Sequence, residues 1–250
     1  MAITNRDSGT RIDEIADGIY RIHTPLPPSL FSGGFSFNQY LIVDDEPLLF
    51  HTGLRRMFPL VRAAIEAVMP ASKLRHIAFS HVEADECGAL NEFLAAAPAA
   101  APLCGKLAAM VSIGDLADRP PRGLADGEIV PLGRHSVQWL DASHVPHGWE
   151  CGFMFETRTR TLLCGDLLTQ GGADRPPLTT ADILESSEPF RLAMDYYAHA
   201  PHTGATLERL AATQPATLAC MHGSAWQGDG GDMLRALASR LESGRPSKAA

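Results

Sequence analysis

The sequence has no apolar run long enough to span a membrane, and residues 1–18 lack the apolar core of a signal peptide. We therefore expect a cytoplasmic protein with no membrane partner. The chain also has no run of Lys or Arg, and its formal net charge is −8. This charge argues against nucleic acid and anionic membrane surfaces as partners.

Cysteines are few, odd in number and without a CxxC pair, so neither a disulfide framework nor a rubredoxin-type metal site is expected. Three of the five lie in apolar runs and are expected to be buried, reduced thiols. Cys87 differs because it lies in a charged segment, where it is a candidate for lining a site without binding a metal. The five are Cys87, Cys104, Cys151, Cys164 and Cys220.

The chain is long enough for one large domain or two small ones. Its 250 residues are 45% hydrophobic, which suffices for a substantial core. The segments richest in Pro and Gly, 118–127 and 170–177, are too short to serve as convincing linkers. We therefore expect a single domain over residues 1–250.

Hydrophobic periodicity predicts strands followed by helices in each half of the chain. Strands are expected at 18–26, 37–45, 46–53, 74–81, 127–133, 135–142, 151–157, 159–166 and 215–223. Helices are expected at 57–70, 88–100, 180–198, 203–212 and 231–243. This order favours the α/β class and a four-layer αββα sandwich, in which two sheets are each covered by helices.

Candidate metal ligands follow the ends of four expected strands. His81, Asp166 and His222 lie at the ends of three expected strands, and His147 follows a fourth, 135–142. Strand ends are common positions for functional sites because the strands fix where the loop side chains lie. The sequence therefore predicts one metal site built from four loops.

The segment 80–90, SHVEADECGAL, concentrates one imidazole and three carboxylates. His81, Glu83 and Asp85 alternate, so a locally extended loop would direct all three to one side, and Glu86 adds a fourth donor at the turn. These carboxylates repel one another unless cations lie between them. An alternative for Asp85 and Glu86 is that they cap the helix that follows.

These motifs, in the order SHVEADECGAL, SHVPHGWECGFMF, LLCGD and CMHGSAW, resemble the metallo-β-lactamase fold. Within that fold they look like the diiron branch, which contains flavodiiron proteins and free-standing oxygen-binding diiron proteins. That branch has the motif His-x-Glu-x-Asp-His, then a lone His, an Asp after an apolar strand, and a final His before Gly. The zinc hydrolases of the fold usually have His where this chain has Glu83.

The resemblance implies two metal positions bridged by Asp166. It assigns His81, Glu83 and His147 to one metal, and Asp85, Glu86 and His222 to the other. His147 is preferred over His144 because its spacing to Asp166 fits the family better. His144 would then contact the ligands without binding a metal itself. The chain departs from the family at two positions, since Glu86 replaces the usual His and His51 replaces a supporting Asp.

Three imidazoles and four carboxylates form an oxygen-rich set, which suits iron or manganese better than zinc. Four carboxylates neutralise two divalent ions, and also two trivalent ions joined by an oxo bridge. We therefore expect two Fe ions with a bridging oxo or hydroxo group, with Mn or Zn as alternatives. Trp149, Tyr196 and Tyr197 either line this pocket or only pack against neighbours.

Two functions from different classes fit this prediction. The first is a non-haem diiron protein that binds or reduces dioxygen, as a sensor with a signalling partner or as an oxidase served by an external reductase. The resemblance implies that a flavin domain would supply the electrons, but no flavin site is expected in this chain. The second is a metal-dependent hydrolase that uses a bridging hydroxide. We expect a homodimer in either case.

Overall fold

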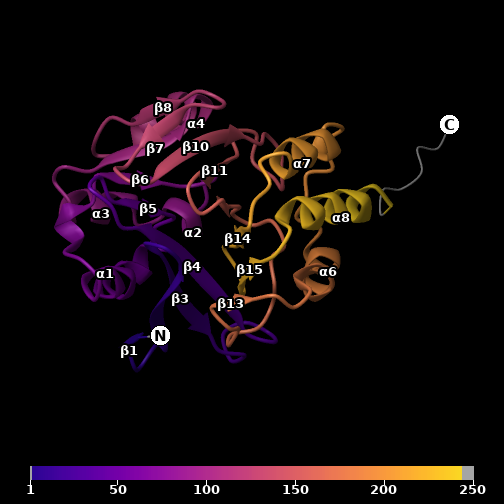
Figure 1. Cartoon of the computed structure of the whole chain (residues 1–250). Helices are drawn as coiled ribbons and strands as arrows, with labels where there is room; N and C mark the ends of the chain where they lie inside the picture. Colours follow the sequence, from indigo (N-terminus) through magenta and orange to yellow (C-terminus); the bar gives the residue numbers. More distant parts are fainter. Residues whose placement is uncertain (1, 244–250) are drawn as a thin grey trace.

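A computed structural model describes residues 2–243 of the chain, which fold into two β-sheets with helices on their outer faces (Figure 1). The first sheet comes from the N-terminal half of the chain, and the second from the C-terminal half. In Figure 1, helices α1 and α3 lie on one side of the molecule, and α6, α7 and α8 lie on the other.

The first sheet has eight strands in the order in which they occur along the chain. Strands β1 to β5 pair antiparallel, and β5 to β8 pair parallel. The strands are β1 (Ala2–Asn5), β2 (Thr10–Ala16), β3 (Ile19–Leu26), β4 (Phe35–Ile42), β5 (Leu48–Phe50), β6 (His76–Ala78), β7 (Ala101–Gly105) and β8 (Arg122–Leu124).

The second sheet has seven strands in the order β13-β15-β14-β12-β11-β10-β9. Strands β12 and β14 are parallel neighbours, so the loops that follow them leave the same edge of the sheet. The strands are β9 (Ile129–Pro131), β10 (Ser136–Asp141), β11 (Gly152–Glu156), β12 (Thr161–Leu163), β13 (Leu178–Thr179), β14 (Thr217–Ala219) and β15 (Ala225–Gln227).

The helices differ in length, and the longest lie in the C-terminal half. They are α1 (Phe58–Glu66), α2 (Ala84–Cys87), α3 (Leu90–Ala96), α4 (Lys106–Ala108), α5 (Gly114–Leu116), α6 (Ile183–Met194), α7 (Thr203–Ala211) and α8 (Gly230–Ser243). A π-helical segment, Ala109–Ile113, joins α4 to α5, and two 3₁₀ turns, Arg55–Met57 and Ala71–Lys73, flank α1.

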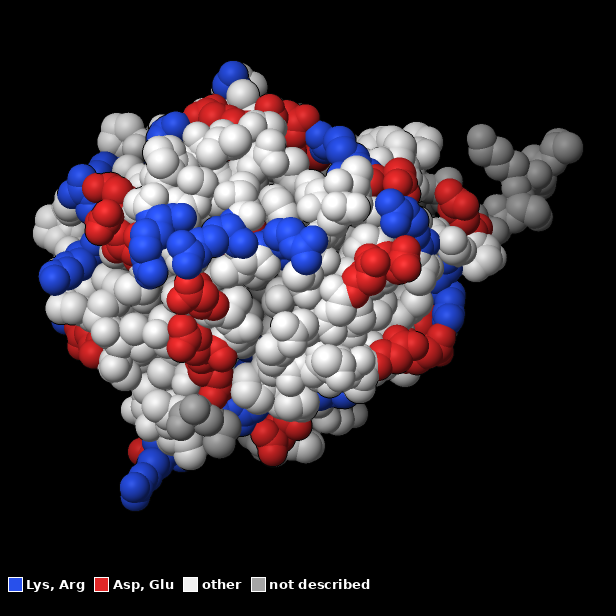
Figure 2. All heavy atoms as spheres, viewed as in Figure 1, with Lys and Arg blue, Asp and Glu red and all other residues white. Residues whose placement is uncertain are grey.

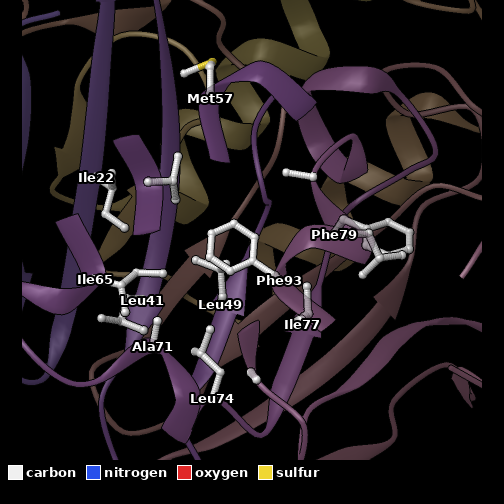
Figure 3. Packing of buried hydrophobic residues seen from close by; sticks show 14 of the residues in the cluster. Ile22, Leu41, Leu49, Met57, Ile65, Ala71, Leu74, Ile77, Phe79 and Phe93 are labelled. Carbon is white, nitrogen blue, oxygen red and sulfur yellow. The ribbon is translucent and has the colours of Figure 1, made fainter. Parts of the chain in front are cut away.

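Three clusters of buried hydrophobic residues fill the spaces between these layers. The first fills the space between the first sheet and helices α1 and α3, and includes Leu49, Ile65 and Phe93 (Figure 3). A second packs α6, α7 and α8 against the second sheet. The third lies between the sheets and contains Tyr40 and Trp139. These three interfaces confirm the predicted α/β class and the four-layer αββα sandwich.

Most predicted elements are present, but the predicted helix 88–100 is wrong at its C-terminal end. Helix α3 ends at Ala96 because a proline at position 98 disfavours helical backbone in the residue before it. The alanines beyond this proline lead into strand β7, which the sequence interpretation missed. It also missed strands β1, β2, β8, β13 and β15 and the helical segment from α4 to α5.

The outer surface mixes charges of both signs. Figure 2 shows basic side chains close to acidic ones on the face in view. Exposed ion pairs such as Arg62–Glu66 at 2.8 Å and Arg235–Glu208 at 3.0 Å are examples of this pairing. Among the described residues, no helix is long and apolar enough to cross a membrane.

Candidate metal centre

Four loops at strand ends bring the predicted ligands together. His81 lies shortly after β6, and His147 lies in the loop that joins β10 to β11. Asp166 follows β12 and His222 follows β14. The loops that carry these last two residues are adjacent because their strands are hydrogen-bonded neighbours.

The first group of donors gathers around two imidazoles. The Nε2 atoms of His81 and His147 lie 2.9 Å apart. Oδ2 of Asp166 lies 3.4 Å from Nε2 of His147 and 3.6 Å from Nε2 of His81. Oε1 of Glu83 lies 3.3 Å and 3.8 Å from the same two atoms. The donor atoms of His81, His147 and Asp166 are close enough together to hold one metal ion, and Glu83 lies beside the two imidazoles.

The second group gathers around His222. Its Nε2 lies 3.2 Å from Oδ1 of Asp166 and 3.5 Å from Oδ2 of Asp85. Glu86 joins Asp85 and His222 in this group. The two oxygens of Asp166 therefore face different groups, which is the arrangement that a bridging carboxylate requires.

Each of the three ligand imidazoles is held in place through its other nitrogen. Nδ1 of His81 lies 2.9 Å from Oγ of Ser80, Nδ1 of His147 lies 3.0 Å from the Tyr196 carbonyl, and Nδ1 of His222 lies 2.8 Å from a third oxygen, the Ser36 carbonyl. A carbonyl partner requires a proton on Nδ1 of His147 and of His222. Their Nε2 atoms are thereby left free to bind metal, as is usual for histidine ligands.

His51 contacts this system through Ser80. Its Nε2 lies 3.0 Å from Oγ of Ser80, which in turn contacts His81. His51 is fully buried, with a positive φ of 66°. Burial is the main cause that lowers its pKa to about 3, so the ring is neutral. The structure thus places His51 one hydroxyl group away from a candidate ligand.

The structure places His144 away from the donor atoms. Its side chain is exposed, and its ring packs against His202 with a centroid separation of 6.0 Å. None of the groups of close donors among the described residues includes His144. His147, and not His144, therefore belongs to a group of close donors among the described residues.

The segment with the acidic cluster is not fully extended. Residues up to Glu83 are irregular, and Asp85 and Glu86 lie in the first turn of α2. The side chain of Glu83, at the N-cap, makes no capping hydrogen bond. The oxygens of Glu86 are buried and accept no hydrogen bond from any described residue, so a capping role for Glu86 finds no support.

The charges in the site favour a bound cation. Burial is the main cause that raises the pKa of Glu86 well above its ordinary value, and the charges of Asp166 and Asp85 add to it. Hydrogen bonds from His147 and His81 lower the pKa of Glu83 to about 2. For Asp166, burial acts in the opposite direction, but the three imidazoles outweigh it and lower the pKa. Buried carboxylates without partners are costly unless a metal neutralises them, so these residues fit a dinuclear centre.

Sequence reasoning named Tyr196 as a residue that either lines the pocket or only packs, but it missed the contacts that hold the candidate ligands. Tyr196 carries the carbonyl that contacts His147, and its hydroxyl donates to the Asp166 carbonyl at 3.1 Å. Glu150 is buried and accepts a hydrogen bond from the Val82 backbone N–H at 3.0 Å. Only the position of Ser80 next to His81 could have drawn attention to such a role.

Comparison with known proteins places this chain in a family. The model of the family described as "ODP family beta lactamase" matches residues 35–223. The chain therefore belongs to the ODP family of metallo-β-lactamase-fold proteins.

Two curated relatives are enzymes of gas metabolism by name. The chain is 25% identical over 229 residues to a nitric oxide reductase of Moorella thermoacetica, covering 86% of this chain and 56% of that protein. It is 26% identical over 212 residues to a rubredoxin-oxygen oxidoreductase of Megalodesulfovibrio gigas, covering 78% of this chain and 50% of that protein. The chain thus spans about half the length of these relatives.

Solved structures show the same fold. The rubredoxin oxygen:oxidoreductase of Desulfovibrio gigas matches with a TM-score of 0.77 and 18% identity over 92% of this chain and 62% of that one. A mutant flavo-diiron protein of Thermotoga maritima matches with a TM-score of 0.80 and 16% identity, over 96% of this chain and 63% of that one. A fragment of a diflavin flavoprotein of Nostoc sp. matches with a TM-score of 0.79 and 16% identity, over 94% of each chain. The fold is therefore that of the diiron core of flavodiiron proteins.

Proposed function

We propose that this chain is a non-haem diiron protein that binds or reduces dioxygen, either as a sensor or as an oxidase that takes electrons from a separate donor. The observation that carries the proposal is the position of Asp166, whose Oδ1 faces His222 while its Oδ2 faces His81 and His147. One buried carboxylate between two donor groups is suited to hold two metal ions close together.

The donor set supports iron as the metal, with manganese as the nearest alternative. Three imidazoles and four carboxylates converge, and none of the five cysteines belongs to a donor group among the described residues. Oxygen-rich sets suit iron and manganese, whereas thiolate-rich sets suit zinc. When bound, a pair of irons would supply electrons to dioxygen, while the residues of this chain fix the two positions and hold the imidazoles in orientation.

The names of the relatives support oxygen or nitric oxide chemistry, and the proposal carries dioxygen over to this chain. Because the chain matches only about half of each relative, their electron pathway is not transferred with it. We propose that a reductase supplies electrons to the centre, or that a signalling partner responds to the dioxygen bound there.

The proposal includes a homodimer in the cytoplasm. All five cysteines are free thiols in the structure, which suits a reducing compartment. Large apolar side chains are exposed on the loops and helix near the centre, and they are candidates for a contact with a second copy or a donor. They are Leu30, Phe31, Trp149, Leu192 and Met194.

Metal analysis tests this proposal. Protein expressed with iron, manganese and zinc all available is expected to contain about two irons per chain, by elemental analysis. A preparation with stoichiometric zinc and little iron, which also hydrolyses an ester or a lactam, would contradict the proposal and favour the hydrolase alternative.

A further inference from the structure

Glu86 is unusual among the carboxylates of the centre because neither of its oxygens pairs with an imidazole within 4 Å among the described residues, whereas Glu83, Asp85 and Asp166 each do. It is fully buried, and neither of its oxygens accepts a hydrogen bond from a described residue. Glu83, by contrast, is half-exposed, and Oδ2 of Asp85 lies within 3.5 Å of His222. A buried carboxylate with two unsatisfied oxygens is costly, and a cation at each oxygen offsets that cost.

Among the described residues, Glu86 and His81 are the two that belong to more than one donor group. It lies with Asp85 and His222 in one group, and with His81 and Glu83 in another. In each group, one donor atom from every member lies within 4.8 Å of the others. Glu86 therefore reaches the donors of both metal positions, and not only those around His222.

From these two observations we infer that Glu86 bridges the two metal positions, alongside Asp166, and that it sets their preference for oxygen-loving metals. The inference rests on the proposed dinuclear centre. One oxygen of Glu86 binds on the His81 side and the other on the His222 side, so both buried oxygens gain a partner. A carboxylate can do this, whereas the imidazole usual at this position in related proteins offers one metal-binding nitrogen once its other nitrogen is held.

The composition of the second position follows from this assignment. Its donors are carboxylates of Asp85, Asp166 and Glu86, together with the single imidazole of His222. Such a donor set suits harder ions, such as those of manganese and iron, better than it suits zinc, which binds nitrogen donors well. Replacing Glu86 by His returns a nitrogen to this position and removes one bridge.

Metal titration tests the preference without any reaction with oxygen. Apo-protein is titrated anaerobically with Mn(II) and, separately, with Zn(II), and binding is followed calorimetrically for wild type, Glu86→His and Glu86→Gln. We expect the ratio of Mn(II) to Zn(II) affinity at the second position to fall by roughly tenfold or more in Glu86→His. Glu86→Gln keeps the shape of the side chain, and we expect it to weaken binding of both Mn(II) ions rather than of one.

The matched control is Glu156→Gln, because Glu156 is a fully buried carboxylate that lies 3.1 Å from Nδ1 of His135 and belongs to no donor group among the described residues. It should leave both affinities unchanged. A crystal structure of the Mn(II)-loaded protein then tests the bridge directly, with the expected result that each Glu86 oxygen binds a different ion.

The outcomes separate this inference from the proposed function. If wild type binds two ions but both Glu86 oxygens bind the same one, or if Glu86→His keeps the wild-type metal preference, the inference is overturned while the dinuclear centre stands. If wild type fails to bind two ions of either metal, the dinuclear centre itself is wrong, and the bridge falls with it.

Discussion

Ser80 connects His51 to the candidate metal centre. Its hydroxyl lies between Nε2 of His51 and Nδ1 of His81, at 3.0 Å and 2.9 Å. We expect Ser80→Ala to lower metal affinity about ten- to a hundredfold, because the His81 ring loses the contact that fixes its orientation. Anaerobic titration with Mn(II) measures this. Ser186→Ala, which removes a hydroxyl bonded only within helix α6, should have no effect, and equal affinities in the two variants would contradict the role of Ser80.

The two histidines of the 144–147 loop are expected to behave differently. His147→Ala removes a donor whose Nε2 lies 2.9 Å from that of His81, so we expect it to lose one metal per chain. His144→Ala removes an exposed ring that contacts His202 and should keep both metals. Elemental analysis of the two variants decides the choice, and loss of metal in His144→Ala alone would reverse the assignment.

His23 gives the metal-free protein a pH-dependent stability. Burial, followed by the charge of Arg21, lowers the pKa of His23 from 6.5 to about 3. The folded state keeps the ring neutral below pH 6.5, whereas the unfolded state takes up a proton, so stability is lost as the pH falls through this range. Between about pH 7.5 and about pH 5.5, we expect wild type to lose about 1 kcal/mol more than His23→Gln. Urea unfolding at both pH values measures the difference, and equal losses would show that His23 titrates normally when folded.

At the residue scale, the sequence was informative where spacing and chemistry coincide. The candidate ligands could be predicted because imidazoles and carboxylates rarely follow four strand ends in one chain. The contacts that hold them could not, because the Ser36 and Tyr196 carbonyls are backbone groups that every residue type possesses. The reach of Glu86 into both donor groups depends on the turn of α2, which no sequence pattern fixed.

At the scale of elements, helix α6 and the segment after it connect the outer layer to the centre. The side chain of Asp182 caps the helix by accepting from Leu184 N–H at 2.8 Å and Glu185 N–H at 3.2 Å. We expect Asp182→Ala to lower the free energy of unfolding by about 0.5–2 kcal/mol while both metals stay bound. Thermal or urea unfolding combined with metal analysis checks both parts.

The control for this prediction is Asp232→Ala in helix α8. Asp232 lies in the first turn of that helix but is largely exposed, and it pairs with Arg235 at 3.4 Å. Its replacement should cost less than the loss of the Asp182 cap. Metal loss in Asp182→Ala would instead show that the start of α6 helps to position the centre.

The elements that escaped prediction share a physical cause. Strand β7 is short, and alanines that favour helices precede it, so local propensity pointed to the wrong structure. It becomes a strand because it pairs in parallel with both β6 and β8, contacts that are distant in sequence. Strand β2 is likewise fixed by its pairing with β3.

At the scale of the whole molecule, the four layers could be predicted because each half of the chain runs from strands to helices. The structure explains this order through the three buried clusters, two under helices and one between the sheets. The centre lies at loops contributed by both sheets, so both halves must fold for the ligands to meet.

The reaction of the reduced, iron-loaded protein with dioxygen tests the central claim most directly. The chain is loaded with two Fe(II) under anaerobic conditions and mixed with oxygenated buffer in a stopped-flow spectrometer. We predict a rapid change in visible absorption that occurs once and repeats only when a reductant is added. Asp166→Ala should abolish it by separating the two metals, and His199→Ala, an exposed histidine paired with Asp195, should not. A diferrous sample that stays spectrally unchanged for minutes, while the same preparation hydrolyses an ester or a lactam, would contradict the account.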